Sequence, residues 1–254
     1  MTSTIRVGRI LNPTDLRCVL VDCSDGSVFQ KIITTDTNIV KRLDGLIVAD
    51  VKSIIKNKHV FLGRRSPSYI LRVGFEILQS SNPKANIEEL VVEALRMDFS
   101  AVISTLTIGH EDERIDSDSM KLIAMLSDVC YDYELPFIVE AAPFGERVSS
   151  ENYSESVGLA ARMAVEVGAS IVAIPPLKKV EDLKNVMESV KTYTLLIDPS
   201  SKLVIEKMQQ SLPDILLSIL GIGLNGIVLS SSLNIGNPVD LLTDVLSIVH
   251  GRFD

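Results

Sequence analysis

The sequence is poor in groups that form disulfides. Its only cysteines are Cys18, Cys23 and Cys130, an odd number without a CxxC pair. This spacing predicts reduced, buried thiols in a cytoplasmic protein rather than a disulfide framework. Cys23 follows Asp22 at the end of a predicted strand, but the sequence offers no adjacent base to activate it. We therefore expect a buried thiol and not a nucleophile at this position.

Histidines are equally scarce. His59, His110 and His250 are the only three, and they form neither an HxH nor an HExxH motif with acidic neighbours. The sequence therefore predicts no metal site. Of the three, only His110 follows a predicted strand closely enough to lie at a functional rim.

Long basic runs and long hydrophobic runs are also absent. Lys and Arg number 25 against 33 Asp and Glu, which gives a net charge of −8 without a basic cluster, so we expect no nucleic-acid partner. No stretch approaches the roughly 18 continuous apolar residues of a membrane span. Residues 1–15 lack the apolar segment of a signal peptide. These absences predict a cytoplasmic protein with no membrane partner.

The chain does contain enough apolar material for one large core, because hydrophobic residues make up 46% of its 254 positions. The length would permit two domains, but no linker or low-complexity segment divides the chain. We therefore expect one domain over residues 1–254.

Short apolar runs alternate with stretches of helical periodicity. This alternation predicts parallel strands with helical crossovers, because apolar strands must be covered on both faces. The runs lie at residues 17–23, 43–50, 68–75, 100–108, 136–143, 170–176, 192–199 and 226–233. The helical patterns lie at residues 87–97, 117–134, 153–168, 180–190, 201–212 and 238–251.

Eight such units predict a closed (β/α)₈ TIM barrel. The alternative is a doubly wound open sheet, but no GxGxxG motif follows the first run, where a dinucleotide fold would need it. The glycine-rich GIGLNG at 221–226 precedes the last run and is more typical of a helix end. We expect no cofactor.

Polar side chains gather at or near the carboxyl ends of the predicted strands, where TIM-barrel enzymes hold their active sites. They are Asp22, Arg72, Thr105, Thr107, His110, Glu140, Asp198, Lys202, Ser230, Ser231 and Ser232. Charges inside apolar strands are costly unless they are paired or line a wet pocket. The charged residues on the odd-numbered strands are therefore either a salt-bridge cluster that plugs the barrel or part of a pocket for a small hydroxylated or phosphorylated molecule.

Several segments resemble those of one enzyme family in the same order. They are RILNPTDLRCVLVD, EALRMDFSAVISTLTIGHEDE, LPFIVEAAPFG, VGLAARMAVEVGASIVAIPP and NGIVLSSSLNIGNPVDLLTDVLSIVHG. In these segments the chain resembles the archaeal-type class I fructose-bisphosphate aldolases, (β/α)₈ barrels that form a Schiff base between a lysine and the ketose. The resemblance implies a homo-oligomer, since these aldolases assemble into rings of subunits.

The chain departs from that family at its catalytic positions. The family carries GADIVK on the sixth strand, whereas residues 168–173 read GASIVA and put Ala173 at the position of the lysine. The family's fifth strand ends Trp-x-Tyr-Pro-Arg-Gly, whereas residues 140–145 read EAAPFG and put Ala142 at the position of the proton-transferring tyrosine. Alanine has no nucleophile, so the family's imine cannot form at position 173.

The family's phosphate-binding positions are changed as well. Residues 199–202 read PSSK where the family has Gly-Gly-Pro-Lys, and Ser230-Ser231 replace a Gly-Arg pair. Lys202 alone is retained. We expect it at the start of the helix predicted over 201–212, where it could pair with a phosphate.

The leading hypothesis is an aldolase-family barrel without Schiff-base chemistry, either a pseudoenzyme or a repurposed pocket for a small ligand. A second is an active carbon–carbon lyase or transferase that uses the amine of Lys178, Lys179 or Lys202. A third is a non-catalytic scaffold or regulatory subunit that assembles with an active paralogue. Lys191 is a weaker candidate, because it precedes the seventh run and should lie at the amino end of the barrel.

Overall fold

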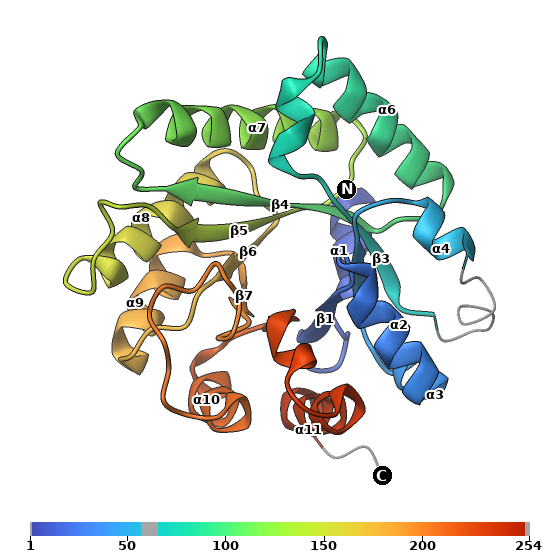
Figure 1. The fold of residues 1–254 in the computed structure, drawn as a ribbon, viewed down its shortest axis with the longest axis vertical. Helices are drawn as coiled ribbons and strands as arrows, with labels where there is room; N and C mark the ends of the chain where they lie inside the picture. The colour runs from blue at the N-terminus through green and yellow to red at the C-terminus, as the bar shows by residue number, and fades with distance from the viewer. Residues whose placement is uncertain (1, 57–65, 252–254) are drawn as a thin grey trace.

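Each of the eight apolar runs forms a β-strand, and the strands pair in parallel in chain order until the eighth returns to the first. The computed structural model describes residues 2–56 and 66–251. The closed barrel confirms the predicted (β/α)₈ architecture and excludes the open sheet (Figure 1). The strands are β1 (Cys18–Asp22), β2 (Gly45–Val48), β3 (Ser68–Arg72), β4 (Ala101–Ile108), β5 (Phe137–Pro143), β6 (Ile171–Ile174), β7 (Tyr193–Ile197) and β8 (Gly226–Leu229).

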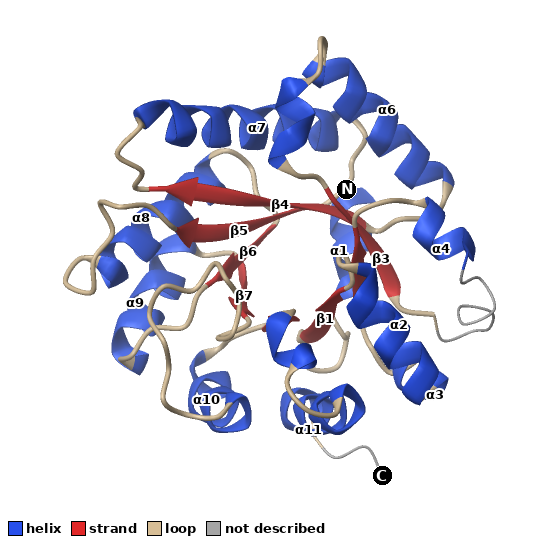
Figure 2. Ribbon diagram, viewed as in Figure 1, coloured by secondary structure: helices blue, strands red, loops and turns tan. Residues whose placement is uncertain are grey.

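Helices enclose the strands, as Figure 2 shows with the red strands inside the ring of blue helices. The α-helices are α1 (Thr2–Ile10), α2 (Gly26–Thr35), α3 (Thr37–Val40), α4 (Lys52–Lys56), α6 (Pro83–Arg96), α7 (Glu113–Asp132), α8 (Tyr153–Glu166), α9 (Val180–Val190), α10 (Leu212–Ile219) and α11 (Pro238–His250). Three short 3₁₀ segments are η1 (Phe75–Gln79), η2 (Leu220–Ile222) and η3 (Ser231–Asn234). No described helix is both long and apolar enough to cross a membrane.

The prediction of a helix over residues 201–212 was wrong. Residues 201–211 form turns and irregular backbone, and α10 begins only at Leu212. Ser211 caps this helix by accepting a hydrogen bond from the Asp214 amide, and Pro213 occupies its first turn. Proline is favoured there because the first amides of a helix need no partner within it. The glycine-rich stretch at 221–226 does end a helical segment, since Gly223 follows η2 in the left-handed conformation.

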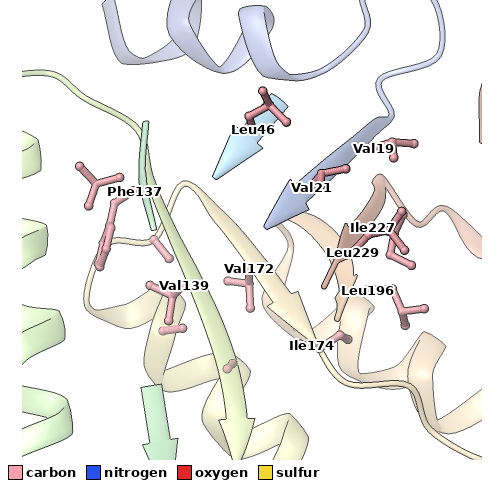
Figure 3. Packing of buried hydrophobic residues seen from close by; sticks show 14 of the residues in the cluster. Val19, Val21, Leu46, Phe137, Val139, Val172, Ile174, Leu196, Ile227 and Leu229 are labelled. Carbon is pink, nitrogen blue, oxygen red and sulfur yellow. The ribbon is translucent and has the colours of Figure 1, made fainter. Parts of the chain in front are cut away.

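The apolar core has two parts. The larger part lies between the strands and the helices, where outward-facing side chains such as Val19, Val139, Val172 and Leu196 meet the helices (Figure 3). The smaller part fills the barrel interior, with Leu20, Ile70, Ile103, Ile138 and Ala173 among its members. This double burial explains why the strands are apolar on both faces.

Both ends of the barrel interior are covered by side chains from outside the strands. At the amino end, Val7, Ile10 and Leu11 of α1 and the segment after it join the interior cluster. Arg6 of the same helix donates to the carbonyl of Phe99, just before β4. At the carboxyl end, Val204 from the segment after β7 packs into the interior cluster. The barrel is therefore a filled core and not a channel.

Candidate functional site

An arginine of β3 inside the barrel holds two carboxylates, one from β1 and one from β5. Arg72 of β3 donates from Nη1 to Oε2 of Glu140 at 2.7 Å and from Nη2 to Oε1 of the same residue at 3.0 Å. Its Nη2 also donates to Oδ2 of Asp22 at 2.8 Å. Such two-pronged contact between guanidinium and carboxylate is the strongest geometry for this pair. The structure thus brings together three of the charged residues that the sequence singled out.

Two further groups complete this cluster. Thr105 of β4 donates its hydroxyl to Oε2 of Glu140 at 2.7 Å, and Oδ1 of Asp22 accepts from the Ser24 amide at 2.9 Å. The Nε atom of Arg72 is buried without a hydrogen-bond partner in the described part of the chain. We call Asp22, Arg72, Thr105 and Glu140 the Arg72 cluster.

Glu140 is charged although it is buried. Burial by itself would raise the pKa of Glu140, but the Arg72 guanidinium and the Thr105 hydroxyl outweigh that effect and lower it. The side chains of Arg72 and Asp22 are 18% and 17% exposed, whereas that of Glu140 is 4% exposed. Glu140 is therefore a fixed carboxylate in an ion pair, not an acid ready to give up a proton.

A second polar cluster forms around Asp198, immediately after β7. Its carboxylate accepts hydrogen bonds from the amides of Ser200, Ser230 and Ser232, each at 2.8 Å, and from the Ser232 hydroxyl at 2.5 Å. Asp198 is fully buried. Among the described residues, no cation forms an ion pair with Asp198. Its carboxylate is stabilised instead by hydrogen bonds from three backbone amides and one hydroxyl.

Comparison with known proteins agrees with this fold. The model of the DeoC/LacD family aldolases matches residues 47–201, which is more than half of the chain. This chain belongs to the DeoC/LacD aldolase family. Solved structures that resemble this chain over nearly its full length are therefore expected to be (β/α)₈ barrels.

Solved structures bear out the same fold at low sequence identity. An archaeal fructose 1,6-bisphosphate aldolase has 18% identity and a TM-score of 0.73, with 98% of this chain and 100% of that chain covered. A second archaeal aldolase, solved with its catalytic lysine bound to the carbinolamine intermediate, has 17% identity, a TM-score of 0.70 and 98% coverage of both chains. The aldolase of Slackia heliotrinireducens has 15% identity and a TM-score of 0.71, with 100% and 87% covered.

The DeoC/LacD barrel of this chain has small apolar residues at the two positions that the resemblance assigns to catalysis. Ala173 of β6 and Ala142 of β5 both belong to the interior cluster and are fully buried. Ala173 pairs with Glu140 across the β5–β6 ladder. The sixth strand therefore faces the barrel interior with a methyl group beside a buried carboxylate.

Lysines of this DeoC/LacD member lie outside the barrel interior. No described strand contains a lysine, and every described lysine is exposed. Lys178 is 62% exposed at its side chain and pairs with Glu206 at 2.8 Å, while Lys179 is the residue before α9. Lys191 ends α9 before β7 begins, which confirms the prediction that it lies at the amino end.

Lys202 does not lie in the predicted helix, and the serines after β8 belong to η3 and to the residue before it. No helix begins at Lys202, because residues 201–211 are irregular, so the predicted helix start at this lysine was wrong. The pairing of Lys202 with a phosphate stays a prediction. Lys202 is exposed, and its charge makes a minor contribution to lowering the pKa of Asp25, which hydrogen bonds from Ser27 lower more. Ser230 contributes its amide to Asp198, and Ser231 opens the short η3.

The histidines lie apart from both clusters. His110 follows β4, and its Nδ1 contacts Oδ1 of Asp116 at 2.5 Å. His250 ends α11 at the amino end of the barrel, where Nδ1 contacts Asp15 at 2.7 Å and Nε2 contacts Asp44 at 2.9 Å. His59 lies outside the described residues. Over residues 2–56 and 66–251, no three His, Cys, Asp or Glu side chains are arranged to hold a metal.

The remaining candidates from the sequence are structural. The Thr107 amide donates a hydrogen bond to the Ser119 hydroxyl oxygen of α7. The three cysteines are free and buried, and burial, with help from Asp22, raises the pKa of the Cys23 thiol far above its usual range. A thiol with a raised pKa is a poor nucleophile at neutral pH, as predicted for this residue.

Two hollows lie away from the Arg72 cluster. One of about 880 Å³ lies at the amino ends of β5 and β6, beside the end of α7. Another of about 340 Å³ lies between Gly109 and α8, with Leu159 and Met163 on its wall. Neither is lined by the charged residues of the barrel interior, so neither is a candidate for chemistry at those residues.

Proposed function

We propose that this member of the DeoC/LacD aldolase family does not work through a Schiff base. In this proposal the barrel is a pseudoenzyme or a repurposed site for a small hydroxylated or phosphorylated molecule. The observation that carries the proposal is the position of the described lysines, since none of them lies on a strand and all of them are exposed. An imine-forming amine is activated by burial in an apolar pocket or by a neighbouring cation, and a lysine surrounded by water has neither.

The surroundings of β6 support the same proposal. Ala173 offers no nucleophile, and its neighbour Glu140 is already held by Arg72 and Thr105. Ala142 offers no hydroxyl for proton transfer. The second hypothesis, a relocated lysine, finds less support, because Lys178 is paired with Glu206 on the surface and both Lys179 and Lys202 are exposed.

The experiment that tests the proposal is reductive trapping. The protein is incubated with dihydroxyacetone phosphate or fructose 1,6-bisphosphate, reduced with borohydride, and weighed by intact-mass spectrometry. We expect no covalent adduct. A stoichiometric adduct, located on a lysine by peptide mapping, would show that an amine does form the imine and would refute the proposal.

The proposal also covers the cellular location and the protein partners. A cytoplasmic location is favoured by three buried, unpaired thiols, which an oxidising compartment would not require. In a scaffold or regulatory role, within a homo-oligomer or together with an active paralogue, the protein keeps the barrel fold and lacks aldolase catalysis. Native mass spectrometry of the purified chain, alone and co-expressed with an active family member, distinguishes this role from that of a ligand-binding pseudoenzyme.

A further inference from the structure

The loops after β7 and β8 together form a cradle of hydrogen-bond donors. The amides of Ser200, Ser230 and Ser232 and the hydroxyl of Ser232 converge on one carboxylate. Oδ1 of Asp198 accepts from Ser200 and the Ser232 hydroxyl, and Oδ2 accepts from the two remaining amides. Converging backbone amides of this kind form binding sites for anions.

A local turn does not account for this arrangement. The bond from the Ser200 amide joins residues two apart and is the usual turn made by an aspartate. The bonds from Ser230 and Ser232 span 32 and 34 positions and come from the next strand's loop. The two loops therefore direct their donors to one point, and the occupant of that point is a side chain of the protein.

The backbone holds Asp198 at this point. Its amide donates to the carbonyl of Val228 on β8 at 2.9 Å, and its carbonyl accepts from the Ser201 amide at 2.8 Å. The residue is fully buried, and no cation of the described chain pairs with it. The carboxylate is thus bound as a free anion would be, by amides and a hydroxyl instead of by opposite charge.

The cradle lies where TIM barrels commonly bind phosphate. In many such enzymes the loops after strands 7 and 8, with a short extra helix, hold a phosphoryl group. Here those loops carry Ser200, Ser230 and Ser232, and the short helix is η3 (Ser231–Asn234). We propose that the carboxylate of Asp198 permanently occupies the anion cradle of this barrel, so that any ligand of the site is hydroxylated but not phosphorylated at this end.

Two physical effects exclude a phosphoryl group from the cradle around Asp198. All four donors are already used, so a phosphate would have to displace the carboxylate and leave it buried without partners. A dianion beside a buried carboxylate would also meet direct repulsion. This inference rests on the proposed function, because it narrows the ligand class of the same barrel from phosphorylated or hydroxylated molecules to unphosphorylated ones.

The test removes the built-in anion. Asp198→Ser takes away the carboxylate and leaves the donors of the two loops unfilled. We expect inorganic phosphate, compared with chloride at equal ionic strength, to raise the melting temperature of this variant by at least about 3 °C and that of the wild type not at all. The matched control is Asp25→Ser, which removes one exposed negative charge near Lys202 and keeps a helix-capping side chain.

Each outcome decides the inference. Stabilisation of Asp198→Ser alone supports it, whereas equal stabilisation of Asp25→Ser would mean that net charge is responsible and would overturn it. If Asp198→Ser does not fold, the wild type gives the answer by NMR. Its Ser200, Ser230 and Ser232 amide signals should not move when inorganic phosphate is titrated in, and a saturable shift of these signals would contradict the proposal.

The result can be separated from that of the trapping experiment. A lysine adduct in borohydride would refute the proposed function whatever phosphate does to the amides. A phosphate-induced shift at Ser230 and Ser232 without any adduct would refute only the occupied cradle. The two proposals therefore fail in different measurements.

Discussion

Glu140 and Ala173 are partners across the β5–β6 ladder, and both face the barrel interior. The buried carboxylate thus lies beside the position that the family resemblance assigns to the imine-forming lysine. A lysine at that position would meet a fixed negative charge and not the apolar surroundings that make an amine reactive.

The first prediction concerns that position. Ala173→Lys should not restore aldol cleavage of fructose 1,6-bisphosphate above background. The new ammonium would pair with Glu140, which keeps its pKa high, and Ala142 offers no hydroxyl for proton transfer. Cleavage is measured in a coupled assay and imine formation by borohydride trapping. Substantial cleavage by the single variant would contradict the role assigned here to Glu140.

The second prediction concerns the Arg72 cluster. Arg72→Met should lower the free energy of unfolding by about 3–5 kcal/mol, because it leaves Glu140 buried without its counter-charge. Urea unfolding measures the loss. Arg9→Met is the matched control, since its pair with Asp98 is exposed on both sides and should contribute no more than about 1 kcal/mol.

A double variant separates packing from charge in the same cluster. Arg72→Met combined with Glu140→Leu should cost less than Arg72→Met alone, because no unpaired charge then remains on β5. A double variant less stable than the sum of the two single changes would argue against a structural ion pair at this place.

The third prediction is a dependence of stability on pH through His250. Burial favours neutral His250, but the carboxylates of Asp44 and Asp15 outweigh it and raise the pKa. A raised pKa in the folded state means that the stabilisation is complete below the unfolded-state pKa of about 6.5 and is lost as pH rises through the folded-state pKa. Urea midpoints from about pH 6 to pH 9 should therefore fall in the wild type.

His250→Gln is the control for this dependence. The variant cannot become charged, so its urea midpoint should not show the decline attributed to His250 over the same pH range. An equal decline in both proteins would assign the dependence to another group.

The fourth prediction concerns the thiols. Cys18, Cys23 and Cys130 are all buried, and burial raises the pKa of Cys130 to about 12. A disulfide reagent such as DTNB should react with the native protein at least about a hundredfold more slowly than with the urea-unfolded chain. Gln30→Cys, an exposed position on α2, should add one fast-reacting thiol. A fast thiol in the wild type would contradict the burial of all three.

The strands could be predicted from the sequence because the barrel buries both of their faces. Runs such as the one that contains Ile171–Ile174 are apolar at every position and end at proline or at polar loops. The helices α1 to α4 were not predicted. All four have ten residues or fewer, and the apolar side chains of α1 fill the barrel end instead of covering the sheet. The prediction of a helix over 201–212 failed for a related reason. Val204 points into the barrel interior, and it gives the apolar residues of this irregular segment the spacing of a helix.

Alternation along the strands explains which site residues meet. Asp22, Arg72 and Glu140 follow the inward-facing Leu20, Ile70 and Ile138 by two positions, so they also face inward and meet. Asp198 directly follows the inward-facing Ile197 and therefore has the opposite alternation. Its carboxylate turns to the loop of the next strand, which no pattern in the sequence indicates. The short Ser211-Leu212-Pro213 signal, a capping residue before a first-turn proline, was present and would have located α10.

The seam between β1 and β8 has a consequence for how the protein is made. Gly226 opens β8 with φ near +130°, and a Cβ there would lie 1.8 Å from the carbonyl oxygen of Cys18, so only glycine lets the last strand close against the first. β1 leaves the ribosome long before this partner exists. Until residues 226–229 are available, β1 lacks one of its two partner strands, and the interior around Leu20 and Ala173 cannot be closed off. Closure of the barrel therefore waits until all seven other strands have been made.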